Sequence, residues 1–88
     1  MLERRVIVGS KVGLHARPAA LFVKAAAAAP VPVTIGVGDG EPVDARSLLS
    51  VMGLGARGGD EVVLRADGPE AEAALAELAT VIAADHDG

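Results

Sequence analysis

The sequence contains no cysteine, no tryptophan, no tyrosine and a single phenylalanine among its 88 residues. Without cysteine, the chain has neither a disulfide framework nor a thiolate metal site. With one aromatic residue, the core must be built from valine, leucine, isoleucine, methionine and alanine. A chain of this length is expected to bury roughly 60–65% of its unfolded surface, which is enough for one modest core. We therefore expect a single domain over residues 1–88.

Positive charge and long apolar runs are also scarce. The chain has 8 basic and 12 acidic residues and a formal net charge of −4, whereas nucleic-acid-binding proteins carry a surplus of lysine and arginine. The alanine run 25–29 is far shorter than the roughly 20 residues of a membrane span, and the N-terminus shows no apolar signal-peptide region. We expect a soluble, cytoplasmic protein with no nucleic-acid partner and no membrane insertion.

Hydrophobic periodicity predicts four strands and three helices in the order βαββαβα. Apolar and polar side chains alternate in the strand segments, whereas the last helix carries an apolar stripe at helical spacing. Helices packed on one face of a mainly antiparallel sheet satisfy both patterns in a two-layer α+β domain. The predicted strands are 2–9, 31–37, 41–44 and 61–66, and the predicted helices are 16–29, 48–54 and one that starts at Gly68–Pro69. The apolar stripe comprises Ala71, Ala74, Leu75, Leu78 and Ile82.

The segment Gly-Leu-His-Ala-Arg-Pro at 13–18 places His15 where the first helix is predicted to begin. Helices usually begin with Ser, Thr, Asp or Asn, whose side chains accept a bond from the first backbone N–H groups. With histidine there, the N–H groups of Ala16 and Arg17 and the positive end of the helix dipole would attract an anion. Pro18 fits the first turn, where no N–H is needed.

This arrangement suits a phosphoryl group carried on His15. A neutral imidazole is a good nucleophile near pH 7, and the side chain of Arg17 would add a charge-assisted contact to the group. Because the P–N bond stays reactive, the group can be passed on again. The alternative from residue type alone is a solvated or capping histidine.

Two motifs, Gly13–Ala19 and Ala45–Gly55, resemble those of the histidine-containing phosphocarrier (HPr) family of the bacterial phosphoenolpyruvate-dependent sugar phosphotransferase system. The resemblance covers nearly the whole chain. It implies an open-faced β-sandwich with a four-stranded antiparallel sheet of order 1-4-2-3 and three helices on one face. The spacing from His15 to Ser47 is one residue longer than in many relatives, and the extra residue fits most easily in the glycine-rich hairpin at 36–40.

The resemblance also implies the chemistry. His15 would accept a phosphoryl group on Nδ1 from phosphorylated enzyme I and donate it to a histidine of a sugar-specific enzyme IIA. Arg17 would steer the group, and residues Ala16, Arg17 and Pro18 would hold it at the helix N-terminus. Such a protein is a carrier, recharged in every cycle, rather than an enzyme. It needs no metal and no cofactor, and we expect a monomer.

Ser47 matches the regulatory serine of the family. In many relatives a serine kinase/phosphorylase modifies this serine. The added phosphate brings about −1.5 to −2 charge to the surface on which partners would dock. Serine is also a good N-cap, so it is expected to open the second helix whether or not it is modified. In that helix Ser50 stands where several relatives have glycine or a basic residue, which would change partner preference.

The remaining predictions concern the surface that meets these partners. The second helix is too short to bury all of its large apolar side chains, so at least one or two should be exposed. On the first helix the basic residues Arg17 and Lys24 share a face, and with Arg46 they would form a basic rim that favours acidic partners. The predicted partner-binding residues are Ala20, Leu21, Lys24, Arg46, Leu48, Leu49 and Met52.

Three other interpretations remain open. A nitrogen-regulatory or glycerone-kinase-linked phosphocarrier would keep the fold and the histidine, although Ser47 favours the sugar pathway. A non-catalytic docking module would work through the second helix, but it should lack the histidine that this chain retains. An unrelated ligand-binding α+β domain would not account for both motifs. His86, in the polar tail 85–88, is interpreted as a bystander, and the glycines of the 36–40 hairpin are not interpreted as a phosphate loop.

Overall fold

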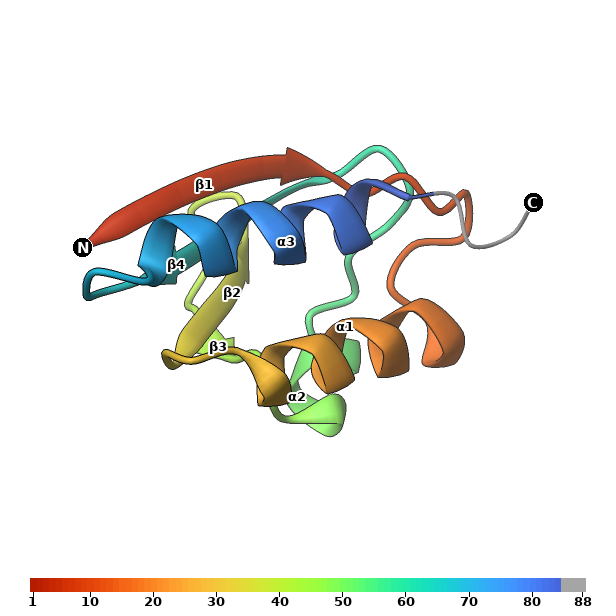
Figure 1. The fold of residues 1–88 in the computed structure, drawn as a ribbon. Helices are drawn as coiled ribbons and strands as arrows, with labels where there is room; N and C mark the ends of the chain where they lie inside the picture. Colours follow the sequence, from red (N-terminus) through yellow and green to blue (C-terminus); the bar gives the residue numbers. More distant parts are fainter. Residues whose placement is uncertain (85–88) are drawn as a thin grey trace.

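The computed structural model describes residues 1–84, which form two layers with three helices on one face of a four-stranded sheet (Figure 1). The strands are β1 (Leu2–Ile7), β2 (Val33–Val37), β3 (Val43–Asp44) and β4 (Glu61–Ala66), and the helices are α1 (Ala16–Ala28), α2 (Leu48–Gly53) and α3 (Ala71–Ala83). The strands lie in the order β1-β4-β2-β3, and each neighbouring pair is antiparallel. The predicted α+β class, element order and 1-4-2-3 sheet are confirmed.

The predicted start of the last helix is wrong. Proline favours a first helical turn, but Pro69 lies in a turn and α3 begins at Ala71. Gly68 adopts a φ of +102°, which redirects the chain after β4 and lies outside right-handed helix geometry. The strands β1, β2 and β3 are shorter than predicted, because residues 8–9, 31–32 and 41–42 lie outside the sheet.

The core fills the space between the sheet and the helices. Alternate residues of β4 point toward the helices, and their partners on β2 do the same, because antiparallel partners share a face. Phe22 of α1, the only aromatic residue, is fully buried in this layer. The predicted stripe of α3 is confirmed, since Ala71, Ala74, Leu75, Leu78 and Ile82 are all buried.

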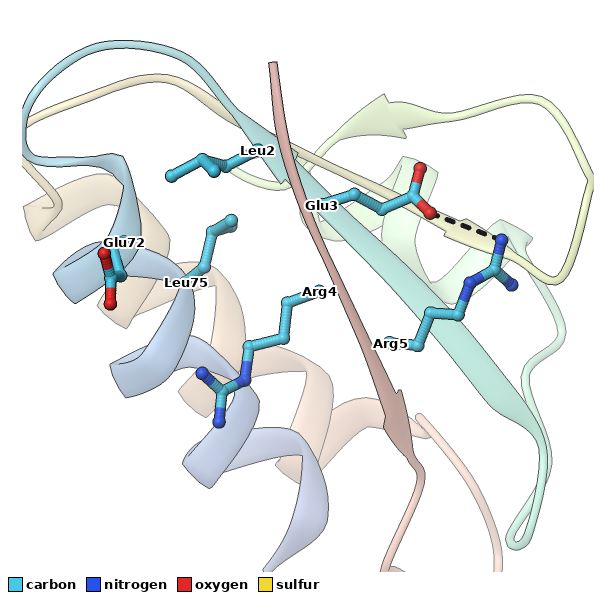
Figure 2. Close-up of a pocket in the computed structure, with 6 residues that line it drawn as sticks. All are labelled: Leu2, Glu3, Arg4, Arg5, Glu72 and Leu75. Atoms are coloured by element: carbon cyan, nitrogen blue, oxygen red, sulfur yellow. Dashed lines mark ion pairs between the residues drawn. The ribbon is translucent and has the colours of Figure 1, made fainter.

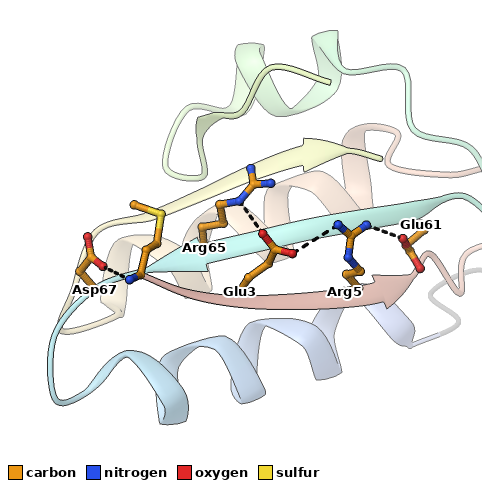
Figure 3. A network of polar contacts seen from close by, with 6 residues as sticks. Glu3, Arg5, Glu61, Arg65 and Asp67 are labelled. Carbon is orange, nitrogen blue, oxygen red and sulfur yellow. Dashed lines mark hydrogen bonds and ion pairs between the residues drawn. The ribbon is translucent and has the colours of Figure 1, made fainter. Parts of the chain in front are cut away.

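The face of the sheet away from the helices carries a ladder of ion pairs between β1 and β4 (Figure 3). Arg5 lies 2.9 Å from Glu61 and 3.3 Å from Glu3, and Arg65 lies 3.0 Å from Glu3. The Arg65 hydrogen bond, helped by the charges of Arg65 and Arg5, lowers the pKa of Glu3. The hydrogen bond to Glu61, with the charge of Glu3, raises the pKa of Arg5. These alternating charges support the β1–β4 register.

Candidate functional site

His15 is the N-cap residue of α1, as predicted, and it is exposed. Its backbone is extended, with φ −80° and ψ −174°, and its carbonyl oxygen accepts the Ala19 N–H at 2.9 Å. The imidazole makes no capping hydrogen bond to the helix, and the first turn contains no acidic residue. The positive end of the α1 dipole is therefore not balanced by a carboxylate in that turn.

Two loops, 9–14 and 55–59, interlock next to His15. Leu14 donates its N–H to the Ala56 carbonyl oxygen at 3.0 Å. Gly13 has a φ of +82°, and a Cβ atom placed on it would lie 2.1 Å from the same oxygen. Conversely, a Cβ atom on Gly58 would lie 2.5 Å from the Ser10 carbonyl oxygen. Each loop thus contributes a glycine that lets the backbones approach, and together they fix the backbone that precedes His15.

Sequence reasoning missed the 55–59 loop as part of the site. The Gly58–Gly59 pair forms a turn, as two consecutive glycines suggest, but nothing local connects that turn to His15. The available signal is a glycine in each of the two loops, at positions 13 and 58. A glycine indicates that another backbone segment passes close to it. Which segment that is depends on how the β1–β4 pair brings the two loops together.

The first turn of α1 places the other predicted phosphate-binding residues beside His15. Arg17 is exposed and forms no ion pair with any residue of the described range 1–84. Pro18 is fully buried, and its missing N–H breaks no helical hydrogen bond because it lies in the first turn. Further along the helix, Ala20, Leu21 and Lys24 are also exposed, whereas Phe22 and Ala26 face the core.

Ser47 is the N-cap of α2, as predicted. Its Oγ accepts the Ser50 N–H at 3.2 Å and donates to the Ser50 Oγ at 3.0 Å. The hydroxyl is thus engaged both as donor and as acceptor, and Ser50, noted as a departure from the family pattern, supplies both partners. The capping role is confirmed, while the regulatory role remains a prediction.

An apolar patch lies on α1 and α2, which pack against each other. Leu49 is 85% exposed, and Val51 is fully buried on the opposite side of the same helix. More of the patch is exposed than the minimum predicted, since all three large side chains named for α2 are accessible. Because partners are predicted to bind here, we call this surface the docking face. It comprises Arg17, Ala20, Leu21, Lys24, Leu48, Leu49 and Met52.

Arg46 differs from the other predicted basic residues because its charge is balanced. The Asp44 carboxylate accepts the Arg46 backbone N–H at 2.9 Å and two guanidinium N–H groups, from Nε and Nη2, at 3.2 Å each. These hydrogen bonds lower the pKa of Asp44 and raise the pKa of Arg46. The basic character of the docking face therefore comes from Arg17 and Lys24.

An open hollow lies away from His15, between β1 and α3 (Figure 2). It is an open groove of about 270 Å³ lined by Leu2, Glu3, Arg4, Arg5, Glu72 and Leu75. None of the predicted site residues lines it. The candidate site is instead an exposed surface around a helix N-terminus, which suits a group that passes between two proteins rather than a small ligand enclosed in a pocket.

Residues 1–84 contain neither a metal-binding cluster nor a membrane-spanning helix. No three His, Asp or Glu side chains gather there in a group that could hold a metal ion. No helix in that range is long and apolar enough to cross a membrane. His86, interpreted as a bystander, lies outside the described residues.

Comparison with known proteins places the chain among phosphocarriers. The family model for the "PTS HPr component phosphorylation site" matches residues 2–84. Phosphocarrier protein HPr of Streptomyces coelicolor is 60% identical over 83 residues, covering 94% of this chain and 89% of the relative. The crystal structure of HPr from Bacillus anthracis superposes with a TM-score of 0.85 at 38% identity, over 92% of this chain and 95% of that one.

A further structural relative is a dimer. The Bacillus subtilis catabolite-repression protein Crh is 40% identical, with a TM-score of 0.71 over 93% of each chain. Its crystal structure is described as a dimer with a swapped domain. At least one relative with this fold therefore forms a dimer.

Proposed function

The chain belongs to the HPr family, the component of the phosphotransferase system that carries the phosphorylation site, and from this we propose that it accepts a phosphoryl group on His15 Nδ1 from phosphorylated enzyme I and donates it to a histidine of an enzyme IIA. The observation that carries the proposal is the position of His15. It is the exposed N-cap of α1, at a helix end with no acidic residue in the first turn.

Transfer follows from this geometry. The neutral imidazole nitrogen of His15 attacks the phosphorus atom as the P–N bond to the donor histidine breaks, so one P–N bond replaces another. The backbone N–H groups of Ala16 and Arg17 and the dipole of α1 stabilise the negative oxygens, and the Arg17 guanidinium adds a charge-assisted hydrogen bond. Because nothing is consumed within this chain, the same step runs in reverse toward the next acceptor.

The proposal includes the setting in which the carrier works. The protein is a single-domain cytoplasmic monomer that is charged and discharged once per cycle, so it is a substrate of other proteins rather than an enzyme. Its partners dock on the docking face, where the apolar patch is flanked by Arg17 and Lys24. Phosphorylation of Ser47 would place about −1.5 to −2 charge on that face and slow docking of acidic partners.

The first experiment is intact mass measurement after mixing the protein with phosphoenolpyruvate and purified enzyme I. We expect a gain of one acid-labile phosphoryl group, absent in His15→Ala. Circular dichroism of His15→Ala serves as the folding control, since the side chain is exposed. No gain, with a folded protein and an enzyme I shown to be active on another carrier, would contradict the proposal and favour a docking module.

A further inference from the structure

The eight basic side chains of the protein divide into two groups. Arg5 and Arg65 form ion pairs with neighbouring carboxylates (Figure 3), and Arg46 forms one with Asp44. The others form no ion pair with any residue in the described part of the chain, although acidic residues are in excess overall. These unpaired cations are Arg4, Lys11, Arg17, Lys24 and Arg57.

The unpaired cations are not spread evenly over the molecule. Lys11 and Arg57 lie in the two interlocked loops, and Arg17 and Lys24 lie on the exposed side of α1. Only Arg4 is elsewhere, in the groove between β1 and α3 (Figure 2). In the described chain, unpaired positive charge is therefore concentrated on the segments that frame His15.

The backbone of Arg57 is held firmly against the loop that precedes His15. A Cβ atom on Gly13 would lie 2.7 Å from the Arg57 Cα atom, so the two backbones are in direct contact. On its other side, the Asp60 carboxylate accepts the Arg57 N–H at 2.9 Å, and the Asp60 N–H donates to the Arg57 carbonyl oxygen at 3.0 Å. The carboxylate nearest along the chain is thus bonded to the backbone of Arg57, while the side chain of Arg57 is exposed.

We propose that Arg57 is a partner-binding residue of the phosphocarrier site, whose guanidinium pairs with carboxylates on the acidic proteins that exchange phosphoryl groups with His15. The inference rests on the function proposed above and adds Arg57, from the 55–59 loop, to its docking face. A cation on a fixed backbone needs no backbone ordering when it binds, so only its side chain must be immobilised, and guanidinium pairs with carboxylates in a bidentate geometry. Arg46 is less suited to this role because Asp44 already occupies its guanidinium.

The chain offers a matched control for this proposal. Arg57 and Arg4 are both exposed arginines without an ion pair in the described chain, so Arg57→Glu and Arg4→Glu change net charge equally. Initial rates of His15 phosphorylation by purified enzyme I and phosphoenolpyruvate would be measured against carrier concentration, at low and at high salt. We expect Arg57→Glu to raise KM about tenfold at low salt with kcat nearly unchanged, and the effect to shrink as salt screens the contact.

Arg4→Glu is expected to leave KM within about twofold of the parent, because a distant exposed charge contributes only weakly through screened solvent. Equal KM values for the two variants, or a fall in kcat with KM unchanged, would overturn the role of Arg57 while leaving the carrier function intact. Failure of the parent protein to be phosphorylated would instead overturn the proposed function and this inference with it. Circular dichroism confirms that each variant is folded before rates are compared.

Discussion

Gly13 packs directly against the carbonyl group of Ala56, so closely that a Cβ atom on Gly13 would come within 2.1 Å of that oxygen. The next residue, Leu14, donates its N–H to the same oxygen at 3.0 Å. The loop that leads into His15 is thus set by a contact with a segment from the second half of the chain. A substitution at this contact should affect both the stability of the fold and the placement of the histidine.

Gly13→Ala is expected to lower the free energy of unfolding by about 3 kcal/mol, because the new methyl group clashes with backbone and the φ of +82° is unfavourable for alanine. Since the loop must move to relieve the clash, kcat/KM for His15 phosphorylation should fall by about tenfold or more. Urea unfolding followed by circular dichroism, together with the enzyme I assay, measures both effects.

Gly59→Ala separates strain from clash in that experiment. Gly59 has a similar φ of +89°, but no other atom lies within 4 Å of a Cβ atom placed there. Gly59→Ala should lower the free energy of unfolding by only about 1 kcal/mol, because alanine is unfavourable in this backbone conformation. It should leave the rate of His15 phosphorylation nearly unchanged. Equal destabilisation in the two variants would show that the contact of Gly13 with Ala56 is unimportant.

Ser47 allows capping and charge to be separated. Ser47→Ala removes the acceptor for the Ser50 N–H and should lower the free energy of unfolding by about 1 kcal/mol. Ser47→Asp keeps a capping oxygen and places negative charge at the helix N-terminus, so stability should stay within about 0.5 kcal/mol of the parent. Chemical denaturation measures both, and a large loss in the aspartate variant would contradict the capping role.

In the transfer assay, Ser47→Asp, the more stable of the two variants, should be the poorer substrate. Ser47→Asp is expected to raise KM for acidic partners because it adds negative charge to the docking face, whereas Ser47→Ala should leave KM close to the parent value. Equal KM values for the two variants would show that charge at this position does not influence docking.

Shortening Leu49 to alanine should weaken partner binding, whereas shortening Val51 to alanine should destabilise the fold. Leu49 is 85% exposed, so Leu49→Ala should change the free energy of unfolding by less than about 0.5 kcal/mol while weakening partner docking. Val51 is fully buried, and Val51→Ala should cost roughly 2 kcal/mol through lost packing. Titration of each folded variant against enzyme I provides the binding arm, and undiminished binding by Leu49→Ala would remove this residue from the docking face.

The ion-pair ladder predicts a pH dependence of stability. Hydrogen bonding to Arg65 lowers the pKa of Glu3 in the folded state, so its stabilising contribution is complete above the ordinary glutamate pKa of about 4.3. The contribution is lost as pH falls through the lowered folded-state pKa. The difference in Tm between the parent and Glu3→Gln should therefore be small but positive near neutral pH and should vanish in acid. If the difference in Tm does not change with pH, the effect of Glu3→Gln comes from packing and not from the ion pair.

The sequence predicts those parts of the molecule that depend on neighbouring residues. The stripe from Ala71 to Ile82 and the strand 61–66 follow from periodicity, and the Ser47 cap follows from residue type. The prediction that α3 starts at Gly68–Pro69 is wrong because Pro69 favours a helix locally, whereas the positive φ of Gly68 shows that the chain is still turning there.

The parts that could not be predicted depend on long-range packing. The ladder joins Glu3 and Arg5 to residues of β4, which requires the register of two strands far apart in the sequence. The contact of Gly13 with Ala56 requires the same pairing. The His15 site was predictable from its motif because its chemistry lies within one short segment, but the loop that supports it was not.

The dependence of the His15 loop on Ala56 also has a consequence for how the protein is made. During translation, His15 is synthesised well before residues 55–59 and before β4, the strand that pairs with β1. A nascent chain that stops short of these segments contains His15 but lacks the surface against which its loop is set. If His15 carries the phosphoryl group as proposed, we expect incomplete chains to be poor acceptors.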